Sequence, residues 1–239
     1  MKQTLSIIIP CYNEKDTILQ ILEKINNVHL YGVEKEIIII DDFSIDGTRK
    51  ILKSLNDYNI IFNDKNYGKG FSVREGIKNA SGNIIIIQDA DLEYNPQNYN
   101  DLVKPILDNN AQVVYGSRAK GPNSAQHSHV TFYLGGKLLT KLTNILYHSK
   151  LSDQPTCYKV FKKSVLDIID LKENGFGFCS EVTCNLLIKN IEPYEVPIDY
   201  YPRNKNEGKK ISWKDGIEAI YIIFKLRIMS VIFKQYFVY

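Results

Sequence analysis

Three carboxylate side chains follow one apolar segment of this sequence at alternating positions. Ile84–Ile87 is an uninterrupted apolar run, too short for a helix, and Asp89, Asp91 and Glu93 come soon after it. Side chains two residues apart in an extended segment point the same way, so the three carboxylates could converge on one cation. Carboxylate oxygens suit Mg²⁺ or Mn²⁺. A calcium loop of the D-x-D-x-D-G type is excluded, because Tyr94 stands where that loop needs glycine. The alternative is an acidic turn that only ends a strand.

The segments that must position these carboxylates alternate between strand and helix patterns. Short apolar runs, typical of buried strands, are separated by segments with helical periodicity. Strands without polar alternation, each followed by a helix, are typical of a mainly parallel sheet covered on both faces. The fold class is therefore α/β. The expected strands are 5–10, 36–40, 60–62, 83–88 and 112–115, and the expected helices are 16–27, one from about 47, 70–79 and 99–109.

Polar clusters fall where the expected strands end. They are Tyr12–Glu14, Asp41–Asp42, Asp89–Glu93 and Ser117–Arg118. Ligands of parallel α/β sheets bind at the carboxyl ends of the strands, so these clusters predict one site.

A dinucleotide or P-loop site does not fit this sequence. The first strand-to-helix turn, Pro10–Glu14, contains no glycine, whereas the G-x-G-x-x-G fingerprint must lie there. Gly68-Lys69-Gly70 comes later and ends at Val73 instead of a third glycine, and G-x-x-x-x-G-K-[ST] does not occur. Nucleotide binding would therefore use side chains and a metal ion.

Composition narrows the class of protein further. A net charge of +3 over 239 residues, without an aromatic-basic motif, argues against nucleic acid as a partner. The four cysteines have no C-x-x-C spacing and read as buried, reduced thiols. No signal peptide and no apolar stretch of membrane-spanning length is present. We expect a cytoplasmic protein, soluble or peripheral on the inner face of the membrane.

The second half of the chain is less regular. A Gly/Pro/Ser/His segment, 121–129, predicts a mobile loop, and a helical pattern covers roughly 137–147. A strand-like segment at 195–201 leads to a charged loop, 203–210. No linker separates the two halves, so we expect one catalytic domain, residues 1–211, with a C-terminal helix, residues 212–239.

Several short motifs, in this order, resemble family 2 glycosyltransferases of the GT-A fold. The similarity covers about residues 5–216 and is nearest to the branch of dolichyl- and polyprenyl-phosphate mannosyltransferases. The motifs are Pro10-x-Tyr12-Asn13-Glu14, Asp41-Asp42-x-Ser44-x-Asp46-Gly47-Thr48, Asn66-x-Gly68-Lys69-Gly70, Asp89-Ala90-Asp91, Tyr115-Gly116-Ser117-Arg118, Thr156-Cys157-Tyr158-Lys159, Glu195-Val196-Pro197-Ile198 and Pro202-Arg203 with Glu207-Gly208-Lys209-Lys210.

The resemblance implies an inverting transfer from a nucleotide diphosphate sugar, GDP-mannose or a UDP-hexose, to a polyprenyl or dolichyl phosphate. Two alternatives stay open. The acceptor could be a hydroxyl of a glycan or glycolipid, or the chain could be a non-catalytic subunit that binds a nucleotide sugar. Glu93 departs from the pattern, since several relatives carry glutamine there.

The resemblance also implies roles for single residues. Pro10, Tyr12 and Glu14 would shape the nucleotide pocket, together with Ala90 of the Asp-Ala-Asp motif. Asp41 would contact the base or the ribose. Asp42 would either contact the nucleotide or organise the turn after its strand. Lys69, between two glycines, would bind a phosphate.

The catalytic residues would combine a metal site with positive charge. Asp91 is the first choice as metal ligand, with Asp89 and Glu93 contributing directly, through water, or by contacting the ribose, so that Asp89 counts among the nucleotide-sugar-binding residues as well. Arg118, Arg203 and Lys209 would bind phosphate oxygens, for which the planar fork of arginine is suited. Glu181 would lie near the acceptor, or would only complement the dipole of a helix N-terminus. A phosphate acceptor is already ionised and needs no strong base, and none of the four histidines falls at an expected strand end.

The last segment, 213–239, predicts a helix with two apolar stripes. One contains Ile217, Ile220, Tyr221, Phe224, Ile228, Val231 and Ile232, and the other contains Ile222, Leu226, Met229 and Phe233. No acidic residue follows Glu218. Apolar faces with only basic charges favour a helix that packs one face on the domain and turns the other to lipid, or to a second copy in a homodimer.

Overall fold

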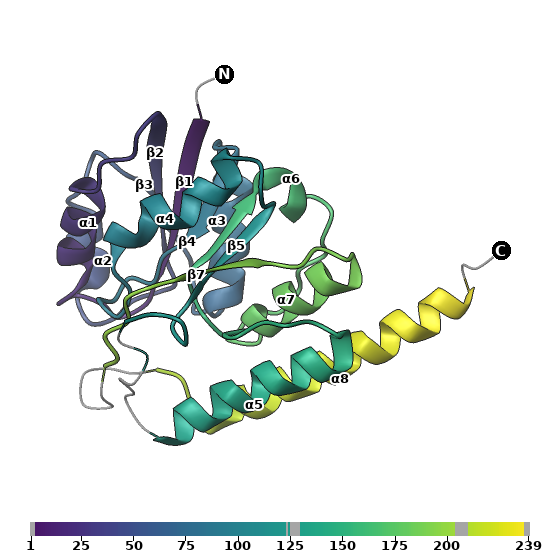
Figure 1. The fold of residues 1–239 in the computed structure, drawn as a ribbon. Coiled ribbons are helices and arrows are strands. Elements are labelled where there is room, and N and C mark those ends of the chain that lie inside the picture. Colours follow the sequence, from purple (N-terminus) through teal and green to yellow (C-terminus); the bar gives the residue numbers. More distant parts are fainter. Residues whose placement is uncertain (1–2, 123, 125–129, 204–209, 237–239) are drawn as a thin grey trace.

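A seven-stranded sheet forms the centre of the computed structural model, which describes residues 3–122, 124, 130–203 and 210–236 (Figure 1). The strand order is β3-β2-β1-β4-β6-β5-β7, and every neighbouring pair except those of β6 is parallel. The strands are β1 (Gln3–Cys11), β2 (Val33–Asp41), β3 (Asn59–Phe62), β4 (Ile84–Ile87), β5 (Val113–Ser117), β6 (Lys159–Lys162) and β7 (Tyr194–Pro197). The expected mainly parallel α/β sheet is confirmed.

Burial explains why the apolar runs became central strands. All four residues of β4 are buried, and so are five consecutive residues of β1, Leu5–Ile9. β1 lies between β2 and β4, so both of its edges are paired and both of its faces are covered. A strand in that position needs apolar side chains on both faces.

β6 is the element that sequence patterns did not indicate. It runs antiparallel between β4 and β5, with Ile86 opposite Val160 and Tyr115 opposite Lys159. The segment Lys-Val-Phe-Lys has a lysine at each end and too few apolar residues for a buried-strand pattern. Its position separates the carboxyl ends of β4 and β5 by one strand.

Helices cover both faces of the sheet (Figure 1). α3 (Lys69–Asn79) packs behind β1 and β2, whereas α4 (Tyr99–Leu107) crosses the front near β5 and β6. A Cβ atom at Gly76 would lie 2.4 Å from Ile8 Cγ2, so glycine allows α3 to approach β1 closely. The other helical segments in this part are α1 (Ile18–Asn26), α2 (Thr48–Leu52), the 3₁₀ turn η1 (Pro96–Asn98), α6 (Lys163–Leu166) and α7 (Phe178–Ile188).

α5 (Val130–Tyr147) and α8 (Trp213–Tyr236) lie side by side along one side of the domain (Figure 1). α5 begins seven residues before the expected start at 137, because Gly135 and Gly136 do not interrupt it. Tyr147 Oη donates a hydrogen bond to the Ile223 carbonyl oxygen at 2.8 Å, which ties the two helices together. Among the described residues, no helix is long and apolar enough to span a bilayer.

α8 packs on the domain through a face that includes Ile222 of the second predicted stripe and two residues of neither stripe, Ala219 and Ile223. Ala219, Ile222 and Ile223 are buried, and α8 contacts α7 and α5. The stripe from Ile217 to Ile232 is the one left exposed, apart from half-buried Ile220. Met229 of the other stripe is exposed as well, and the side chain of Phe233 lies outside the described residues.

Candidate active site

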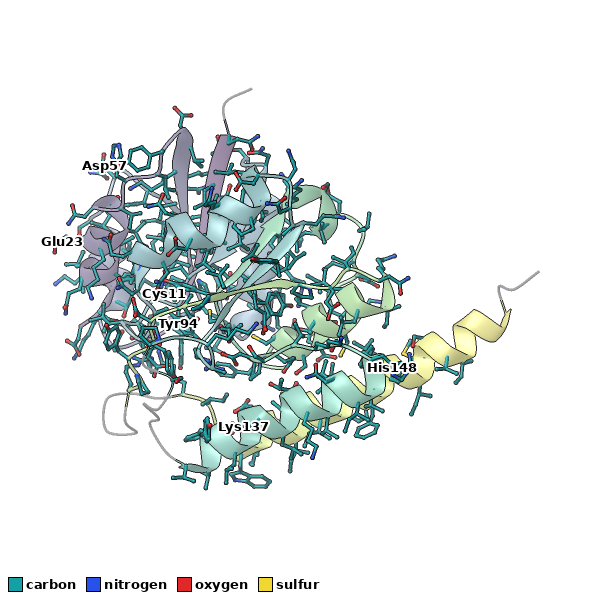
Figure 2. The ribbon with its side chains drawn as sticks, in the orientation of Figure 1. Cys11, Glu23, Asp57, Tyr94, Lys137 and His148 are labelled. Atoms are coloured by element: carbon teal, nitrogen blue, oxygen red, sulfur yellow. The ribbon has the colours of Figure 1, made fainter. Side chains whose placement is uncertain are left out.

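The polar clusters after β1, β2, β4 and β5 lie at the carboxyl edge of the sheet, as expected from the parallel topology. Figure 2 labels Cys11, the last residue of β1, and Tyr94, which follows the carboxylates after β4; both lie at the edge of the domain toward α5 and α8. Strand pairing thus assembles residues that are far apart in sequence into one region.

The loops after β1 and β2 are joined by hydrogen bonds. The Asn13 and Glu14 backbone N–H groups donate to Ser44 Oγ and Thr48 Oγ1, both at 2.9 Å. Asn13 has a φ of 50°, and its side chain accepts from the Ile45 N–H. Pro10 and Tyr12 flank this junction as half-buried residues. The segment proposed to shape a nucleotide pocket is therefore held in a fixed conformation.

The carboxylates after β2 accept mainly from the backbone. Asp42 accepts from the Tyr67 N–H at 2.9 Å, the Gly68 N–H at 2.7 Å and the Asn63 side chain at 2.8 Å. Asp41, fully buried, accepts from the Ser44 N–H at 3.3 Å and from Arg49 Nε at 2.7 Å. This geometry favours a turn-organising role for Asp42, and the nucleotide contacts of both residues stay predictions.

The carboxylates after β4 have different partners, most of which are cationic or hydroxyl groups. Asp89 pairs with the Lys69 ammonium. Asp91 accepts from Arg203 Nη2 at 2.6 Å and from the Glu93 N–H at 3.0 Å. Glu93 accepts from Tyr200 Oη at 2.7 Å and from the Arg203 N–H at 2.8 Å.

These carboxylates do not form a preassembled metal cage. In the described part of the chain, no group of three or more Asp, Glu, His or Cys side chains is arranged to hold a metal ion. Mg²⁺ sites commonly use one or two carboxylates together with substrate phosphates, and Asp91 with one neighbour fits that chemistry. Burial and the neighbouring Asp89 raise the pKa of Asp91 to about 7, although Arg203 opposes the shift. Asp91 is thus a carboxylate that a cation would stabilise.

Lys69 lies where a phosphate could approach it. Its ammonium contacts Asp89 and lies 3.5 Å from Cys157 Sγ, and the Phe176 ring centroid is 5.8 Å away. Burial lowers the pKa of Lys69, but the Asp89 carboxylate outweighs burial and holds that pKa well above its ordinary value. Burial also raises the pKa of Cys157, with Asp89 adding to the shift, so this cysteine is a thiol and not a nucleophilic thiolate.

Arg118 is positioned by a bidentate ion pair. Its Nε and Nη2 atoms donate to the two oxygens of Asp153 at 2.7 Å each, and its backbone N–H donates to Asp153 at 2.9 Å. The guanidinium carbon lies 5.1 Å from the centroid of the Tyr200 ring. Tyr200 also binds Glu93, so the arginine and the carboxylates are parts of one connected site.

Glu181 lies in the first turn of α7, the place that its alternative role at a helix N-terminus requires. Its carboxylate accepts from the backbone N–H groups of Lys172 at 2.8 Å and Glu173 at 3.0 Å. Burial raises its pKa, and these two hydrogen bonds oppose the shift. The loop that it holds contacts α3, where the Asn174 carbonyl oxygen accepts from the Phe71 N–H at 3.1 Å. Its geometry is that of a loop anchor, and its catalytic role stays a prediction.

Ala90 and Lys209 are the two remaining residues of the expected site. Ala90 is buried between Asp89 and Asp91, so its contribution to a ligand site would come from its backbone. Lys209 lies outside the described residues, as does most of the loop 121–129.

Some residues of the site were not singled out from the sequence. Gln88, fully buried, accepts from Tyr99 Oη at 2.6 Å and from Tyr158 Oη at 2.7 Å, and its amide donates to the Asp89 carbonyl. A glutamine directly after four isoleucines is a signal that could have identified it. Asp153 and Lys210 pair with Arg118 and Glu14. No local pattern marks Asp153, and Lys210 was noted only as the last residue of the motif that begins at position 207.

Lys159 is a second buried amine near the site. Its ammonium donates to the Gln154 and Thr156 carbonyl oxygens at 2.8 and 2.7 Å, and it lies 3.9 Å from the Tyr115 ring centroid. Burial lowers its pKa to about 8. Lys159 therefore holds the loop that supplies Asp153 to Arg118.

The model of the glycosyl transferase family 2 matches residues 6–169, which include most of β1, the strands β2 to β6 and the carboxylates after β4. The chain belongs to this family. It is therefore a glycosyltransferase of the GT-A fold, and the resemblance drawn from its motifs is confirmed.

This family 2 glycosyltransferase is similar in sequence to three curated proteins. It is 29% identical over 222 residues to the low-salt glycan biosynthesis hexosyltransferase Agl6 of Haloferax volcanii, and the aligned region covers 89% of this chain and 51% of that relative. It is 26% identical to the UDP-N-acetylglucosamine–dolichyl-phosphate N-acetylglucosaminyltransferase of Methanococcus voltae, covering 95% and 97%. It is 27% identical to the dolichol-phosphate mannosyltransferase of Pyrococcus furiosus, covering 92% and 63%. The chain thus spans about half of the first relative, and less than two thirds of the third.

Solved structures agree on the fold. Glucosyl-3-phosphoglycerate synthase from Mycobacterium tuberculosis, in complex with Mg²⁺ and UDP, superimposes with a TM-score of 0.70 at 17% identity, covering 94% of this chain and 79% of that one. The complex of the same enzyme with Mn²⁺, UDP-glucose and glycerol 3-phosphate gives a TM-score of 0.67 at 18% identity, covering 94% and 80%.

Proposed function

We propose that this family 2 glycosyltransferase transfers a hexose, with inversion, from a nucleotide diphosphate sugar to a polyprenyl or dolichyl phosphate. The observation that carries the proposal is the juxtaposition of the β4 carboxylates with two arginines at one edge of the sheet. Such a site can hold two phosphate-bearing substrates, one through a divalent cation and one through guanidinium groups. Two of the relatives are named as dolichyl- or dolichol-phosphate glycosyltransferases.

Donor binding would use the loops after β1, β2 and β4. The joined loops around Asn13 and Ser44 form a rigid wall for the nucleotide, and Lys69 faces the place where its diphosphate would lie. Mg²⁺ or Mn²⁺, held by Asp91 with Asp89 or Glu93, would neutralise the charge that grows on the departing diphosphate. Lys69 adds a positive charge that Asp89 keeps protonated.

The acceptor would react without a general base. A lipid phosphate is ionised at neutral pH, so its oxygen can attack the anomeric carbon directly while the bond to the diphosphate breaks. Arg118, held by both oxygens of Asp153, and Arg203 would orient that phosphate. His29 lies in the loop before β2 and His148 follows α5, so neither comes from a strand end of the site.

We place the acceptor at a membrane surface because α5 and α8 each expose apolar side chains. Leu134, Leu138 and Ile145 of α5 and Tyr221, Phe224 and Ile228 of α8 are exposed, as is Trp213 at the start of α8. The charged residues of α5 are Lys137 and Lys141, and α8 has no acidic residue after Glu218. Apolar side chains bordered by lysines suit the interface of an anionic bilayer. In this arrangement residues 1–211 are the catalytic unit, and residues 212–239 attach it to the cytoplasmic face.

Transfer is tested with labelled GDP- and UDP-sugars, Mg²⁺ or Mn²⁺, and a short polyprenyl phosphate. A labelled lipid that mild acid cleaves is the expected product, and Asp91→Asn should form none. Label that appears only on a glycan or glycolipid hydroxyl would replace the lipid-phosphate proposal. Binding of a nucleotide sugar without transfer to any acceptor would indicate a non-catalytic subunit.

Membrane attachment is tested by flotation with vesicles that contain anionic lipid. The double variant Leu134→Glu and Ile228→Glu should remain in the soluble fraction, while the wild type floats. Leu19→Glu is the matched control, because Leu19 is equally exposed but lies on α1. Unchanged flotation of the double variant would contradict binding of α5 and α8 to lipid. Loss of a dimer in sedimentation would show that these apolar side chains contact a second copy of the chain instead.

A further inference from the structure

Arg203 pairs with Asp91, the carboxylate that is the first choice as metal ligand. Its Nη2 atom lies 2.6 Å from Asp91 Oδ2, and its Nη1 atom lies 3.0 Å from Glu14 Oε2. The side chain of Arg203 is 16% exposed, and that of Asp91 is 10% exposed. The other oxygen of Asp91 accepts from the Glu93 N–H. Both oxygens of Asp91 are thus engaged by groups of the chain itself.

The guanidinium of Arg203 is not fully satisfied in this place. Its Nε atom is buried and has no hydrogen-bond partner among the described residues, and it lies 3.7 Å from Glu93 Oε1. A planar fork with an unused donor is able to bind another pair of oxygens, such as those of a phosphate.

The backbone at Arg203 is anchored independently of its side chain. The Arg203 N–H donates to Glu93 Oε1 at 2.8 Å, and the Tyr201 N–H donates to the Glu93 carbonyl oxygen at 2.8 Å. Tyr200 Oη binds the other carboxylate oxygen of Glu93. The guanidinium can therefore leave Asp91 by side-chain rotation alone, while Glu93 holds the chain in place.

We propose that Arg203 is the resident cation of the Asp91 site and that the divalent metal displaces it before the acceptor binds. A guanidinium and a divalent cation repel each other at contact distance in a poorly hydrated site, so both cannot bind the same oxygen. The displaced guanidinium then becomes available to the phosphate of the acceptor. The inference rests on the proposed function, and it deepens it by assigning an order: metal and donor bind first, acceptor second.

The other cations of the site within the described residues do not pair with Asp91. Lys69 pairs with Asp89, Lys210 with Glu14, and Arg118 with Asp153. Arg118 therefore offers a matched control. Its replacement removes the same charge and the same guanidinium, yet leaves the contact between Arg203 and Asp91 intact.

The decisive measurement is the affinity of the nucleotide-free protein for Mn²⁺, determined by electron paramagnetic resonance or calorimetry. If Asp91 is free of Arg203 about a tenth of the time, Arg203→Gln should bind Mn²⁺ about tenfold more tightly than the wild type. Arg118→Gln should stay within about twofold of the wild type, because only screened long-range charge is lost. Asp91→Asn should abolish binding at this site in either background.

The inference is overturned if Arg203→Gln binds Mn²⁺ no more tightly than the wild type, if Arg118→Gln gains as much, or if neither protein binds Mn²⁺. Arg203→Lys guards against misfolding of the glutamine variant, since a lysine keeps the charge and should keep Mn²⁺ binding near that of the wild type. A second readout is binding of a short polyprenyl phosphate, which should require Mn²⁺ with GDP or UDP in the wild type. The Mn²⁺ titration uses neither sugar nor lipid, so its failure is distinguishable from absence of transfer.

Discussion

The carboxylates after β2 and those after β4 are similar in sequence but differ in what they bind. Among the described residues, Asp42 accepts from two backbone N–H groups and the Asn63 amide, whereas Asp89 and Asp91 bind Lys69 and Arg203. Asp41 is intermediate, because it accepts from the Ser44 N–H and from Arg49. A backbone N–H group cannot leave without a change of fold, but a long cationic side chain can exchange one partner for another. The difference indicates that Asp42 stabilises the loops, and that Asp89 and Asp91 can exchange a cationic side chain for a ligand.

The largest expected effect comes from removing the charge of Asp91. Asp91→Asn should lower the turnover number about a thousandfold, because the site loses the ligand that would hold the metal at the departing diphosphate. Its melting temperature should stay near that of the wild type. A turnover number within tenfold of the wild type, measured with saturating Mn²⁺ and donor, would contradict a ligand-binding role for Asp91 and with it the functional difference between the carboxylates after β2 and those after β4.

Removing Asp42 should act on stability instead. Asp42→Ala leaves two backbone N–H groups and the Asn63 amide without their acceptor, which should lower the free energy of unfolding by roughly 2–3 kcal/mol. Urea unfolding of Asp42→Ala beside Asp91→Asn measures the difference. A stable Asp42→Ala protein with a raised donor KM would show that Asp42 contacts the nucleotide.

Gly68 tests the loop that Asp42 holds. Its φ is 101°, and a Cβ atom there would lie 2.5 Å from the Asn174 carbonyl oxygen. Gly68→Ala should cost roughly 2 kcal/mol of unfolding free energy, from backbone strain and the displaced loop together. Gly32→Ala is the control, with a φ of 73° and open space around it, and should cost about 1 kcal/mol from strain alone. Equal losses of unfolding free energy in Gly68→Ala and Gly32→Ala would mean that the loop at Asn174 moves away from the added methyl group without loss of stability.

The smallest expected effect is the pH dependence of Asp46, the third carboxylate of the β2 loop. Hydrogen bonds from the Thr48 side chain and N–H hold its pKa below the ordinary value, against the opposing effect of burial. A lowered folded-state pKa means that its contribution is present above the ordinary pKa and is lost as the pH falls through the folded value. Asp46→Asn should therefore be less stable than the wild type at pH 7, by about 1 kcal/mol or less, and equally stable near pH 2. A difference that is constant from pH 7 to pH 2 would contradict this.

Local patterns predicted the strands well because burial on both faces demands uninterrupted apolar residues. Ile84–Ile87 is such a run, Leu5–Ile9 is interrupted only by the buried Ser6, and both became central strands. β6 was missed because its lysines interrupt the pattern, and one of them, Lys159, is buried against carbonyl groups that only the folded loop supplies. The start of α5 was placed too late because Gly135 and Gly136 favour a break that packing does not require.

The positions of Pro10, Asp42, Asp89 and Arg118 at strand ends follow from the order of apolar runs along the chain, since parallel strands bring their carboxyl ends to one edge. Which of these groups pair was decided only by the tertiary structure. Arg203 lies 112 residues from Asp91 and 189 from Glu14, and Arg118 lies 35 from Asp153. No periodicity encodes such pairs, because an ion pair depends on the final distance between two side chains and not on their spacing in sequence. The sequence by itself determined an α/β glycosyltransferase with acids at its strand ends, and the fold decided which of those acids hold the chain together and which hold a cation.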